Sequence, residues 1–423
     1  MWSAPWEQRT LCAIEEKLKT LSQILTFLRN VFIIKLMDIK FQIGVFAMIL
    51  KNGLVMTKDF ELKELDVEVC DGKIKNIGTN LEGEETVDLG GNYLLPGFID
   101  SHIHGAYGAR ISDDNADLSK ITEFEKTQGV TAIAITTAAS EWNSLLEQID
   151  LAVESSIDHK GTKIAGVHLE GPFLCKKYKG AMNEKNIIAP DTDKVDELLE
   201  RGKGLIKIIT IAPENENAVE FIKHVVAKGV TVAMGHTDAT YDHALAGVKA
   251  GITSATHTFN AMRPINHREP GVIGVALTED DVYCEMICDF VHLHPATLKL
   301  IYKAKGADRI KMISDSGHAA GWEVSEFVVD GITRYVVDGV VRLADGTISG
   351  SAKTMLDGFK NLLSMGIPMG EVSKMASLNP AKTMKIDNET GSIEIGKLAD
   401  LVVMDKDYNV LNTYVNGKCV YSA

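Results

Sequence analysis

The segment from Leu94 to Gly105 constrains this chain most, because it is an apolar run that closes on two histidines one residue apart, His102 and His104. Residues i and i+2 of a β-strand point to the same face, so both imidazoles can reach one ion. The glycine that follows permits a turn where a ligand approaches closely. A pair of this kind at the carboxyl end of a strand is where a (β/α) barrel places its chemistry. Taken alone, the pair fits two surface histidines in a turn equally well.

Strand-like and helix-like runs alternate over most of the chain, which indicates βα units around a parallel sheet. Eight strand-like runs end near Ile99, Thr136, Leu169, Ile211, Met234, Thr256, Ile287 and Ile313. Amphipathic stretches between them, such as 193–201 and 217–228, predict helices. Eight such units favour closure, so we expect an α/β fold with a (β/α)8 TIM-like barrel.

Both flanks of the alternating region have β character. Residues 48–92 contain strand patterns with turn signals at Asn52-Gly53 and Asp71-Gly72, and residues 392–423 return to a strand pattern. We expect these two pieces to pair into one small β-sandwich domain built from both chain ends. The barrel is then expected over residues 93–391, with two or three short strands within 327–348.

Residues 1–47 differ from the rest of the chain. A helical pattern runs from Ile14 to Leu36, but charged residues such as Arg29 and Lys35 interrupt it. No uncharged run approaches the roughly 20 residues that span a bilayer, and no small-residue cleavage site follows a clean apolar stretch. We interpret this segment as an extension outside the catalytic fold. Because Met48 opens a self-sufficient β pattern, we interpret Met1 as a misassigned start upstream of the natural one. A peripheral membrane helix is the alternative.

Charge and cysteine content limit the partners and the compartment. The formal net charge of −14 argues against nucleic acid, whose phosphates would be repelled. An anionic substrate would therefore need a local cationic patch. The six cysteines are scattered without a paired framework, which is typical of a reducing cytoplasm.

Acidic and imidazole side chains stand at the ends of several predicted strands: His102, His104, Glu170, His236, His257 and Asp315. Because the carboxyl ends of barrel strands share one rim, these side chains should converge. Imidazoles and carboxylates are the ligands of a catalytic zinc-type centre that keeps one position open for water. One such residue at a strand end is unremarkable, but six of them on five strands argue against a purely structural explanation.

The order His-x-His, Glu, His, His, Asp resembles that of the metal-dependent amidohydrolase superfamily, as does a small β domain made from both chain ends. Three stretches resemble the N-acetylglucosamine-6-phosphate deacetylases within it: His168-Leu-Glu-Gly-Pro-Phe173, His257-Thr-Phe-Asn-Ala-Met262 and His267-Arg-Glu-Pro-Gly271. Two further stretches, 377–381 and 396–400, are shared across the superfamily. The resemblance covers about residues 48–423.

This resemblance implies hydrolytic deacetylation of N-acetyl-D-glucosamine 6-phosphate. It implies that Glu170, His236 and His257 bind a principal divalent ion, zinc or iron, and that Asp315 is the general acid/base. Some members replace the first His-x-His pair and hold a single metal. Both histidines are present here, so the resemblance allows one ion or two per chain, the second bridged through Glu170.

The resemblance also assigns substrate contacts. It implies that Arg268 binds the sugar phosphate alongside Asn260 and Ala261, and that His292 contacts the substrate; arginine suits bidentate phosphate recognition. A surface arginine is the alternative reading of Arg268. Met182 stands where relatives often carry His or Gln and cannot donate a hydrogen bond to the substrate carbonyl. The resemblance further implies a homodimer or a larger homo-oligomer.

Three other functions remain open at this point. The substrate could be another N-acetyl amino sugar phosphate, such as the galactosamine epimer. The chain could also be a different amidohydrolase, such as a cyclic-amide hydrolase or a deaminase. A non-catalytic scaffold on the same barrel would be expected to have lost ligands, and none is lost.

Overall fold

The computed structural model describes residues 47–157, 160–329, 331–337 and 339–423. Residues 48–423 form one compact unit. The helix expected from Ile14 to Leu36 lies outside the described residues. Within the described ranges, no helix combines the length and the apolar character that crossing a membrane requires.

Eight parallel strands form the barrel sheet and pair in the order β15-β14-β13-β12-β11-β10-β9-β6. Their bounds are β6 Phe98–Ile103, β9 Val130–Ala138, β10 Lys163–Glu170, β11 Ile206–Ile211, β12 Thr231–Met234, β13 Ile252–Ala255, β14 Tyr283–Ile287 and β15 Ile310–Ile313. All eight expected strands are present, each ending within a few residues of its expected position. The predicted α/β barrel is confirmed.

The barrel closes between β6 and β15 through a short set of hydrogen bonds. The backbone N–H of Asp315 donates to the carbonyl of His102 at 2.9 Å. The carboxylate of Asp100 accepts from the N–H of Ser314 at 3.3 Å and from the hydroxyl of the same serine. Burial raises the pKa of Asp100 to about 6, although the hydrogen bonds from Ser314 and His102 oppose this rise. The seam of the barrel therefore lies beside the predicted site.

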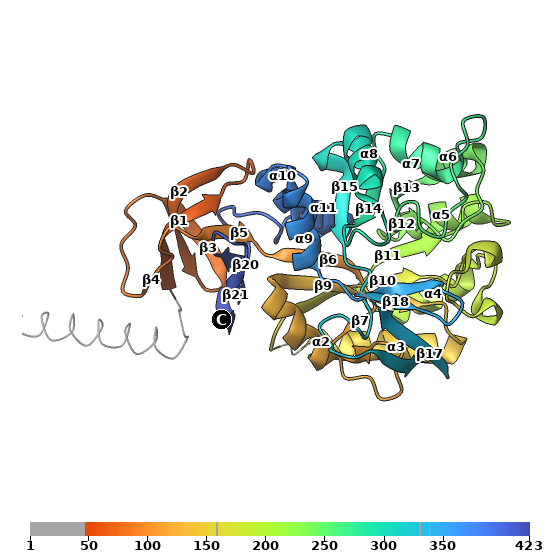
Figure 1. Ribbon diagram of the computed structural model, residues 1–423, viewed down its shortest axis with the longest axis horizontal. Coiled ribbons are helices and arrows are strands. Elements are labelled where there is room, and N and C mark those ends of the chain that lie inside the picture. Colours follow the sequence, from red (N-terminus) through yellow and green to blue (C-terminus); the bar gives the residue numbers. More distant parts are fainter. Residues whose placement is uncertain (1–46, 158–159, 330, 338) are drawn as a thin grey trace, which may run out of the picture. The chain divides into compact units, whose positions relative to one another are not determined.

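Helices lie around the barrel strands (Figure 1). They are α2 Leu118–Glu125, α3 Trp142–Ser155, α4 Thr192–Arg201, α5 Ala218–Ala227, α6 Tyr241–Ala250, α7 Gly271–Thr278, α8 Pro295–Lys305, α9 Met355–Ser364, α10 Met369–Ala376 and α11 Leu378–Thr383. Local sequence fixes several starts: the side chain of Asp191 accepts from two N–H groups of α4, and Thr354 and Asp357 form a capping box on α9. Both helices expected at 193–201 and 217–228 are confirmed as α4 and α5.

A second sheet contains strands from both ends of the described chain, in the order β22-β21-β20-β5-β1-β2-β3, with β4 beside β1. The strands are β1 Ala47–Met56, β2 Leu62–Cys70, β3 Lys73–Gly78, β4 Thr86–Asp88, β5 Tyr93–Pro96, β20 Leu401–Met404, β21 Val410–Val415 and β22 Lys418–Ser422. Antiparallel pairing of β5 with β20 joins the two ends, and Leu50, Leu94 and Leu401 are buried together. The expected small β domain is confirmed, whereas its proposed limits at 92 and 392 stay a prediction.

One of the two turns expected within residues 48–92 differs from the structure, and the other agrees with it. No turn interrupts the chain at Asn52-Gly53, because β1 runs through it with Asn52 at φ +56°. The N–H of Asn52 donates to Asp66 at 3.0 Å and its side chain donates to Asp88 at 3.0 Å, so neighbouring carboxylates hold this bend within the strand. The Asp71-Gly72 turn does join β2 to β3, with both residues at positive φ.

The region expected to hold two or three short strands forms a sheet of four antiparallel strands. They are β16 Glu326–Val329, β17 Ile332–Val337, β18 Val340–Arg342 and β19 Ile348–Ser351. A separate two-stranded ribbon, β7 Gly105–Ala106 and β8 Ala109–Arg110, follows β6 directly. Ser316 and Ser351 form an isolated bridge, which brings the end of β19 against the segment that follows β15.

A buried ion pair joins the barrel to the second sheet. Lys163, at the start of β10, places its Nζ 2.5 Å from the carboxylate of Asp400, which directly precedes β20. Asp400 also accepts from the hydroxyl of Thr390 at 2.7 Å and from the N–H of Asn416 at 2.9 Å. Its side chain is fully buried, and both of its oxygens accept hydrogen bonds inside the protein.

We expect Asp400→Asn to lower the free energy of unfolding by about 3–5 kcal/mol, because it leaves the largely buried ammonium of Lys163 without a counter-charge. Urea unfolding followed by circular dichroism measures this change. Asp308→Asn is the control, since it breaks a pair with Lys374 in which the Asp308 side chain is 75% exposed; we expect a loss below about 1 kcal/mol. Equal losses in the two variants would contradict a special role for the buried pair.

Candidate metal centre

Six side chains meet at the carboxyl end of the barrel, as the sequence predicted. His102 lies in β6 and His104 follows it; Glu170 ends β10; His236, His257 and Asp315 follow β12, β13 and β15. Every one of the six is buried. The barrel thus collects four imidazoles and two carboxylates in one place that is almost closed to solvent.

Glu170 lies at the centre of this cluster. The Nε2 atoms of four imidazoles are near its oxygens: His257 at 2.8 Å, His236 at 3.1 Å, His104 at 3.2 Å and His102 at 3.4 Å. Asp315 lies on the other side of the His-x-His pair, with Oδ1 at 3.3 Å from His104 and 3.5 Å from His102. Both carboxylates therefore face ring nitrogens of the same kind.

The opposite ring nitrogen of each histidine is anchored to an acceptor. The Nδ1 of His236 lies 2.7 Å from the carbonyl of Tyr178, and that of His104 lies 3.0 Å from the carbonyl of Thr136. The Nδ1 of His257 lies 3.1 Å from the carbonyl of Asn260, and that of His102 lies 3.0 Å from the carboxylate of Glu285. Carbonyl and carboxylate oxygens only accept, so each Nδ1 carries a proton. Each ring then has Nε2 left to bind either a proton or a metal ion at the centre of the cluster.

This arrangement fits a divalent cation. The Nε2 atoms of His236 and His257 are 3.1 Å apart and both face the same oxygen of Glu170, so three lone pairs point at one small space. Among the described residues, the buried Nε2 of His102 has no hydrogen-bond partner. Imidazole nitrogen with carboxylate oxygen is a donor set for zinc and similar ions.

Two groups of ligand atoms have the spacing that one ion requires. Glu170, His236 and His257 form the first, and His102, His104 and Asp315 form the second; within each group the atoms lie within 4.8 Å of one another. Glu170 also faces both histidines of the second group. The residues present can therefore hold one ion or two.

Strained backbone aims three of these side chains. His236, His257 and Asp315 have φ values of +46°, +29° and +49°, a region that residues other than glycine rarely occupy. Each of them lies just after the end of a barrel strand, where the chain turns. Such conformations cost about 1–3 kcal/mol each and gather at functional sites, where the surrounding structure holds them.

The charges of the cluster stabilise one another. Burial raises the pKa of Asp315, but the nearby imidazoles of His102 and His104 outweigh burial and hold that pKa at about 2. Burial acts in the same direction on Glu170, yet the histidines around it lower its pKa well below the usual range. Both carboxylates are thus ionised at neutral pH. Burial lowers the pKa of His102, while Asp315, Glu170 and Glu285 raise it to about 10.

Asn260 and Ala261 lie in the turn that follows His257. The carbonyl of Ala261 accepts from the N–H of Thr237 at 3.1 Å, and the carbonyl of Asn260 anchors the ring of His257. The turn after β13 is thereby joined to the turn after β12. These two predicted substrate contacts lie directly beside the cluster.

His292 is connected to the cluster through two intermediates. Its Nδ1 lies 2.7 Å from the carboxylate of Asp289, which also accepts from the hydroxyl of Ser351 at 3.1 Å. The N–H of Ser351 in turn donates to the carbonyl of Asp315 at 3.0 Å. The structure therefore places His292 on the Asp315 side of the cluster.

The contacts of Arg268 and Met182 are with residues outside the cluster. Arg268 lies on an exposed turn, with its guanidinium 2.9 Å from the ring of His267. Met182 packs against a small apolar group that contains Leu174 and Ile187. These contacts do not involve the six ligand-type side chains, so a role of Arg268 or Met182 in substrate binding stays a prediction.

The sequence interpretation missed Glu285 in β14 and Lys311 in β15. Both side chains are fully buried, and their Nζ and Oε1 atoms are 3.0 Å apart. Burial opposes the charge of Glu285, but Lys311 and His102 lower its pKa well below the usual range. The available signal was a charged residue of opposite sign in the middle of each of two consecutive apolar strands.

Comparisons with known proteins agree with this geometry. The N-acetylglucosamine-6-phosphate deacetylase of Bacillus subtilis (strain 168) is 33% identical over 387 residues, which are 89% of this chain and 97% of that protein. The crystal structure of N-acetylglucosamine-6-phosphate deacetylase from Pasteurella multocida superposes with a TM-score of 0.84 at 33% identity, covering 89% of this chain and all of that one. The N-acetylgalactosamine-6-phosphate deacetylase of Escherichia coli O157:H7 is 29% identical over 88% of this chain and 98% of its own length.

The amidohydrolase family matches residues 93–420, which include the whole barrel and the strands β20 and β21. Its members are generally dependent on divalent metals, in accord with the two ligand groups at the barrel mouth. On the evidence of this match, the shared barrel and the relatives above, the chain belongs to the amidohydrolase family.

Proposed function

We propose that the protein hydrolyses the N-acetyl amide of N-acetyl-D-glucosamine 6-phosphate, giving D-glucosamine 6-phosphate and acetate in amino-sugar catabolism. The observation that carries this function is the convergence of four imidazole Nε2 atoms on Glu170, with Asp315 beside them. Relatives with this activity match this chain over nearly their whole length.

Glu170, His236 and His257 would hold the proposed principal ion, zinc or iron. His102 and His104 would hold a second ion together with Glu170. A bound divalent ion of this kind lowers the pKa of water to about 7 and polarises a carbonyl group. The chain contributes the orientation of the ligands and a site from which bulk water is largely excluded.

Asp315 is the proposed general acid/base. Its carboxylate is ionised at neutral pH and stands beside the histidine pair, so it can accept a proton from the attacking water. The same group then returns the proton to the departing amine, which is a poor leaving group without it. The N–H of Asp315 is held by the carbonyl of His102, which fixes the residue relative to β6.

The proposed sugar-phosphate contacts are Arg268, Asn260, Ala261 and His292. Met182 is a further proposed substrate contact, although its side chain has no hydrogen-bond donor for the substrate carbonyl. Because the net charge of the protein is −14, a local cation is needed to attract a phosphate. The exposed guanidinium of Arg268 is the cation that we propose for this role. We further propose that the protein acts in the cytoplasm as a homodimer or a larger homo-oligomer on this small-molecule substrate.

A second candidate substrate is the galactosamine epimer. The Escherichia coli relative named for N-acetylgalactosamine 6-phosphate also matches most of this chain, at 29% identity. The two sugars differ at one hydroxyl, and the amide chemistry is the same for both. Parallel measurement of acetate release from the two sugar phosphates separates these candidates.

We expect wild-type protein to release acetate from N-acetylglucosamine 6-phosphate, and we expect chelation to abolish this activity until zinc or iron is restored. Glu170→Ala and His236→Ala should lose activity and bound metal together, because a catalytic centre has only about three protein ligands. A coupled acetate assay and elemental analysis measure the two properties, and the metal content of the wild type also distinguishes one ion from two.

His224→Ala is the matched control for these variants. His224 lies in α5 on the protein surface and contacts Asp196 at 2.7 Å, so its loss should change neither activity nor metal content. Full metal and full turnover in either ligand variant would refute the proposed principal site.

We expect Asp315→Asn to reduce kcat by about 10²–10⁴-fold, because the amide keeps the shape of the side chain but cannot exchange the proton. Steady-state kinetics with the phosphorylated sugar measures this effect. Since Asp315 also faces the second ligand group, metal content is determined in the same preparation. A variant that retains both ions and more than a tenth of wild-type kcat would exclude Asp315 as the acid/base.

We expect Arg268→Ala to raise KM for the phosphorylated sugar and to leave weak turnover of unphosphorylated N-acetylglucosamine unchanged. Loss of a charge-assisted contact of about 1.5–3 kcal/mol should lower kcat/KM about tenfold or more. Arg201→Ala, which removes an exposed pair with Asp150, is the control and should have no such effect. If Arg268→Ala impairs both sugars equally, the phosphate is bound elsewhere.

A further inference from the structure

A buried pair of opposite charges spans two adjacent barrel strands. Glu285 in β14 and Lys311 in β15 are direct partners in the sheet register, and both side chains are fully buried. Their Nζ and Oε1 atoms lie 3.0 Å apart. Burying a charge is expensive unless it is paired and hydrogen-bonded, so the contacts of the remaining Glu285 oxygen indicate what the pair does.

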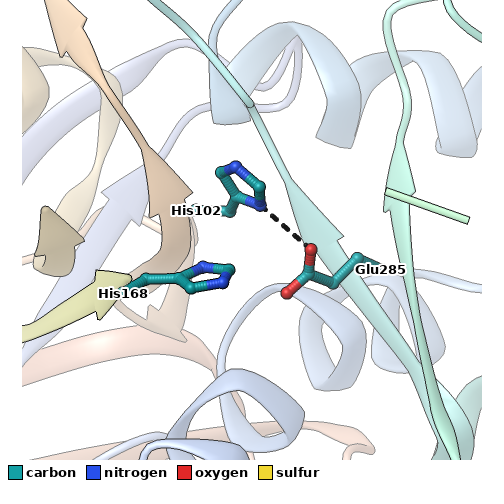
Figure 2. Close-up of side chains that lie close together, drawn as sticks. All are labelled: His102, His168 and Glu285. Atoms are coloured by element: carbon teal, nitrogen blue, oxygen red, sulfur yellow. Dashed lines mark hydrogen bonds and ion pairs between the residues drawn. The ribbon is translucent and has the colours of Figure 1, made fainter. Parts of the chain in front are cut away.

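That second oxygen, Oε2 of Glu285, contacts two histidines of the cluster. It lies 3.0 Å from the Nδ1 of His102, the contact that Figure 2 draws as a dashed line. It also accepts the backbone N–H of His257 at 3.0 Å. His102 belongs to the second ligand group and His257 to the first, so one oxygen atom joins both groups.

Each of these two contacts restrains a different degree of freedom. In His102 the contact fixes the rotation of the ring and holds a proton on Nδ1, which leaves Nε2, facing Glu170 and Asp315, as the nitrogen that can bind a metal ion. In His257 the contact holds the backbone at φ +29°, a conformation that needs support from its surroundings. The main chain of Glu285 adds a further restraint, because its carbonyl accepts the N–H of Thr258 at 3.0 Å.

We propose that Glu285 is a positioning residue of the metal centre, which orients His102 and His257 through a single oxygen while Lys311 balances its charge inside the barrel. The inference rests on the proposed metal centre and adds residues that do not themselves touch the ion. Groups that orient metal-binding histidines through their second ring nitrogen typically change metal affinity by 10–100-fold when they are replaced.

A third ion between His102, His168 and Glu285 is the competing interpretation, because their ligand atoms also lie within 4.8 Å of one another. The ammonium of Lys311 next to Glu285 would repel such a cation. Both nitrogens of His168 already have partners, the carbonyl of Ser101 at 3.2 Å and the hydroxyl of Thr210 at 2.8 Å. The ring of His168 instead packs edge-on against that of His102, with 4.6 Å between ring centroids. The two rings lie next to each other in Figure 2.

Glu285→Asp tests the proposal directly. The shorter side chain keeps a negative charge near Lys311 but withdraws the oxygen from both histidines. We expect zinc affinity, measured by competition with a chromophoric chelator, to fall by about 10–100-fold. Lys163→Met is the control, because it breaks a buried ion pair of the barrel away from the cluster; we expect a lower melting temperature with wild-type zinc affinity.

The double variant Glu285→Gln, Lys311→Met separates hydrogen bonding from charge. It removes both buried charges, and the amide oxygen can still accept from His102 and His257. We expect its zinc affinity to lie closer to that of the wild type than that of Glu285→Asp does. This variant also keeps the proposal testable if the aspartate variant does not fold.

A spectroscopic measurement on the zinc-loaded wild type provides the last test. With 15N-labelled histidine, we expect the Nδ1 of His102 to carry a proton and the Nε2 to show the shift of a bound nitrogen. The proposal is overturned if that Nδ1 carries no proton, or if a folded Glu285→Asp protein binds zinc as tightly as the wild type. A wild type that binds neither zinc nor iron would instead overturn the metal centre itself, and the positioning role with it.

Discussion

The ionised carboxylate of Glu170 is the group on which the rest of the site depends. A buried carboxylate is stable only when it is paired and hydrogen-bonded, and here four imidazoles from three other strand ends face it. The second nitrogen of each ring is attached to a different part of the fold, from the loop at Tyr178 to the interior of β14. The position of one carboxylate is therefore linked to several barrel elements, and its negative charge balances the positive charge, a proton or a divalent cation, that the facing Nε2 atoms bind.

The same cluster lies beside the seam of the barrel. Between β6 and β15 the sheet is joined by the contact of Asp315 with His102 and by the contacts of Ser314 with Asp100. The hydrogen bond between Asp315 and His102 thus belongs both to the seam and to the cluster. Asp315 occupies a left-handed conformation, and hydrogen bonds from its N–H to His102 and from the N–H of Ser351 to its carbonyl hold its backbone there.

Much of the fold could be predicted from the sequence because its two main signals, apolar runs and the polar residues that end them, are local. Apolar runs such as Val130–Ala138 mark strands that are covered on both faces, and a polar residue at the end of such a run is conspicuous. The turn expected at Asn52-Gly53 was wrong because distant carboxylates, those of Asp66 and Asp88, decide the local conformation. Glu285 and Lys311 were overlooked for the same reason, since each gains its meaning only from the strand beside it.

The four anchors of the histidine rings differ in kind, and this difference has a consequence for the two ligand groups. Three rings are anchored to backbone carbonyls, which the fold supplies whatever the side chains are. Only His102 depends on a side chain, that of Glu285, and this dependence runs in both directions, because Glu285 relies on the ring for one of its hydrogen bonds. A chain without histidine at this position would leave a buried carboxylate oxygen with only the N–H of His257 as a donor. The second ligand group and the interior charge pair therefore form one unit, whereas the rings of the first ligand group are anchored to backbone carbonyls and that group meets Glu285 through the backbone N–H of His257.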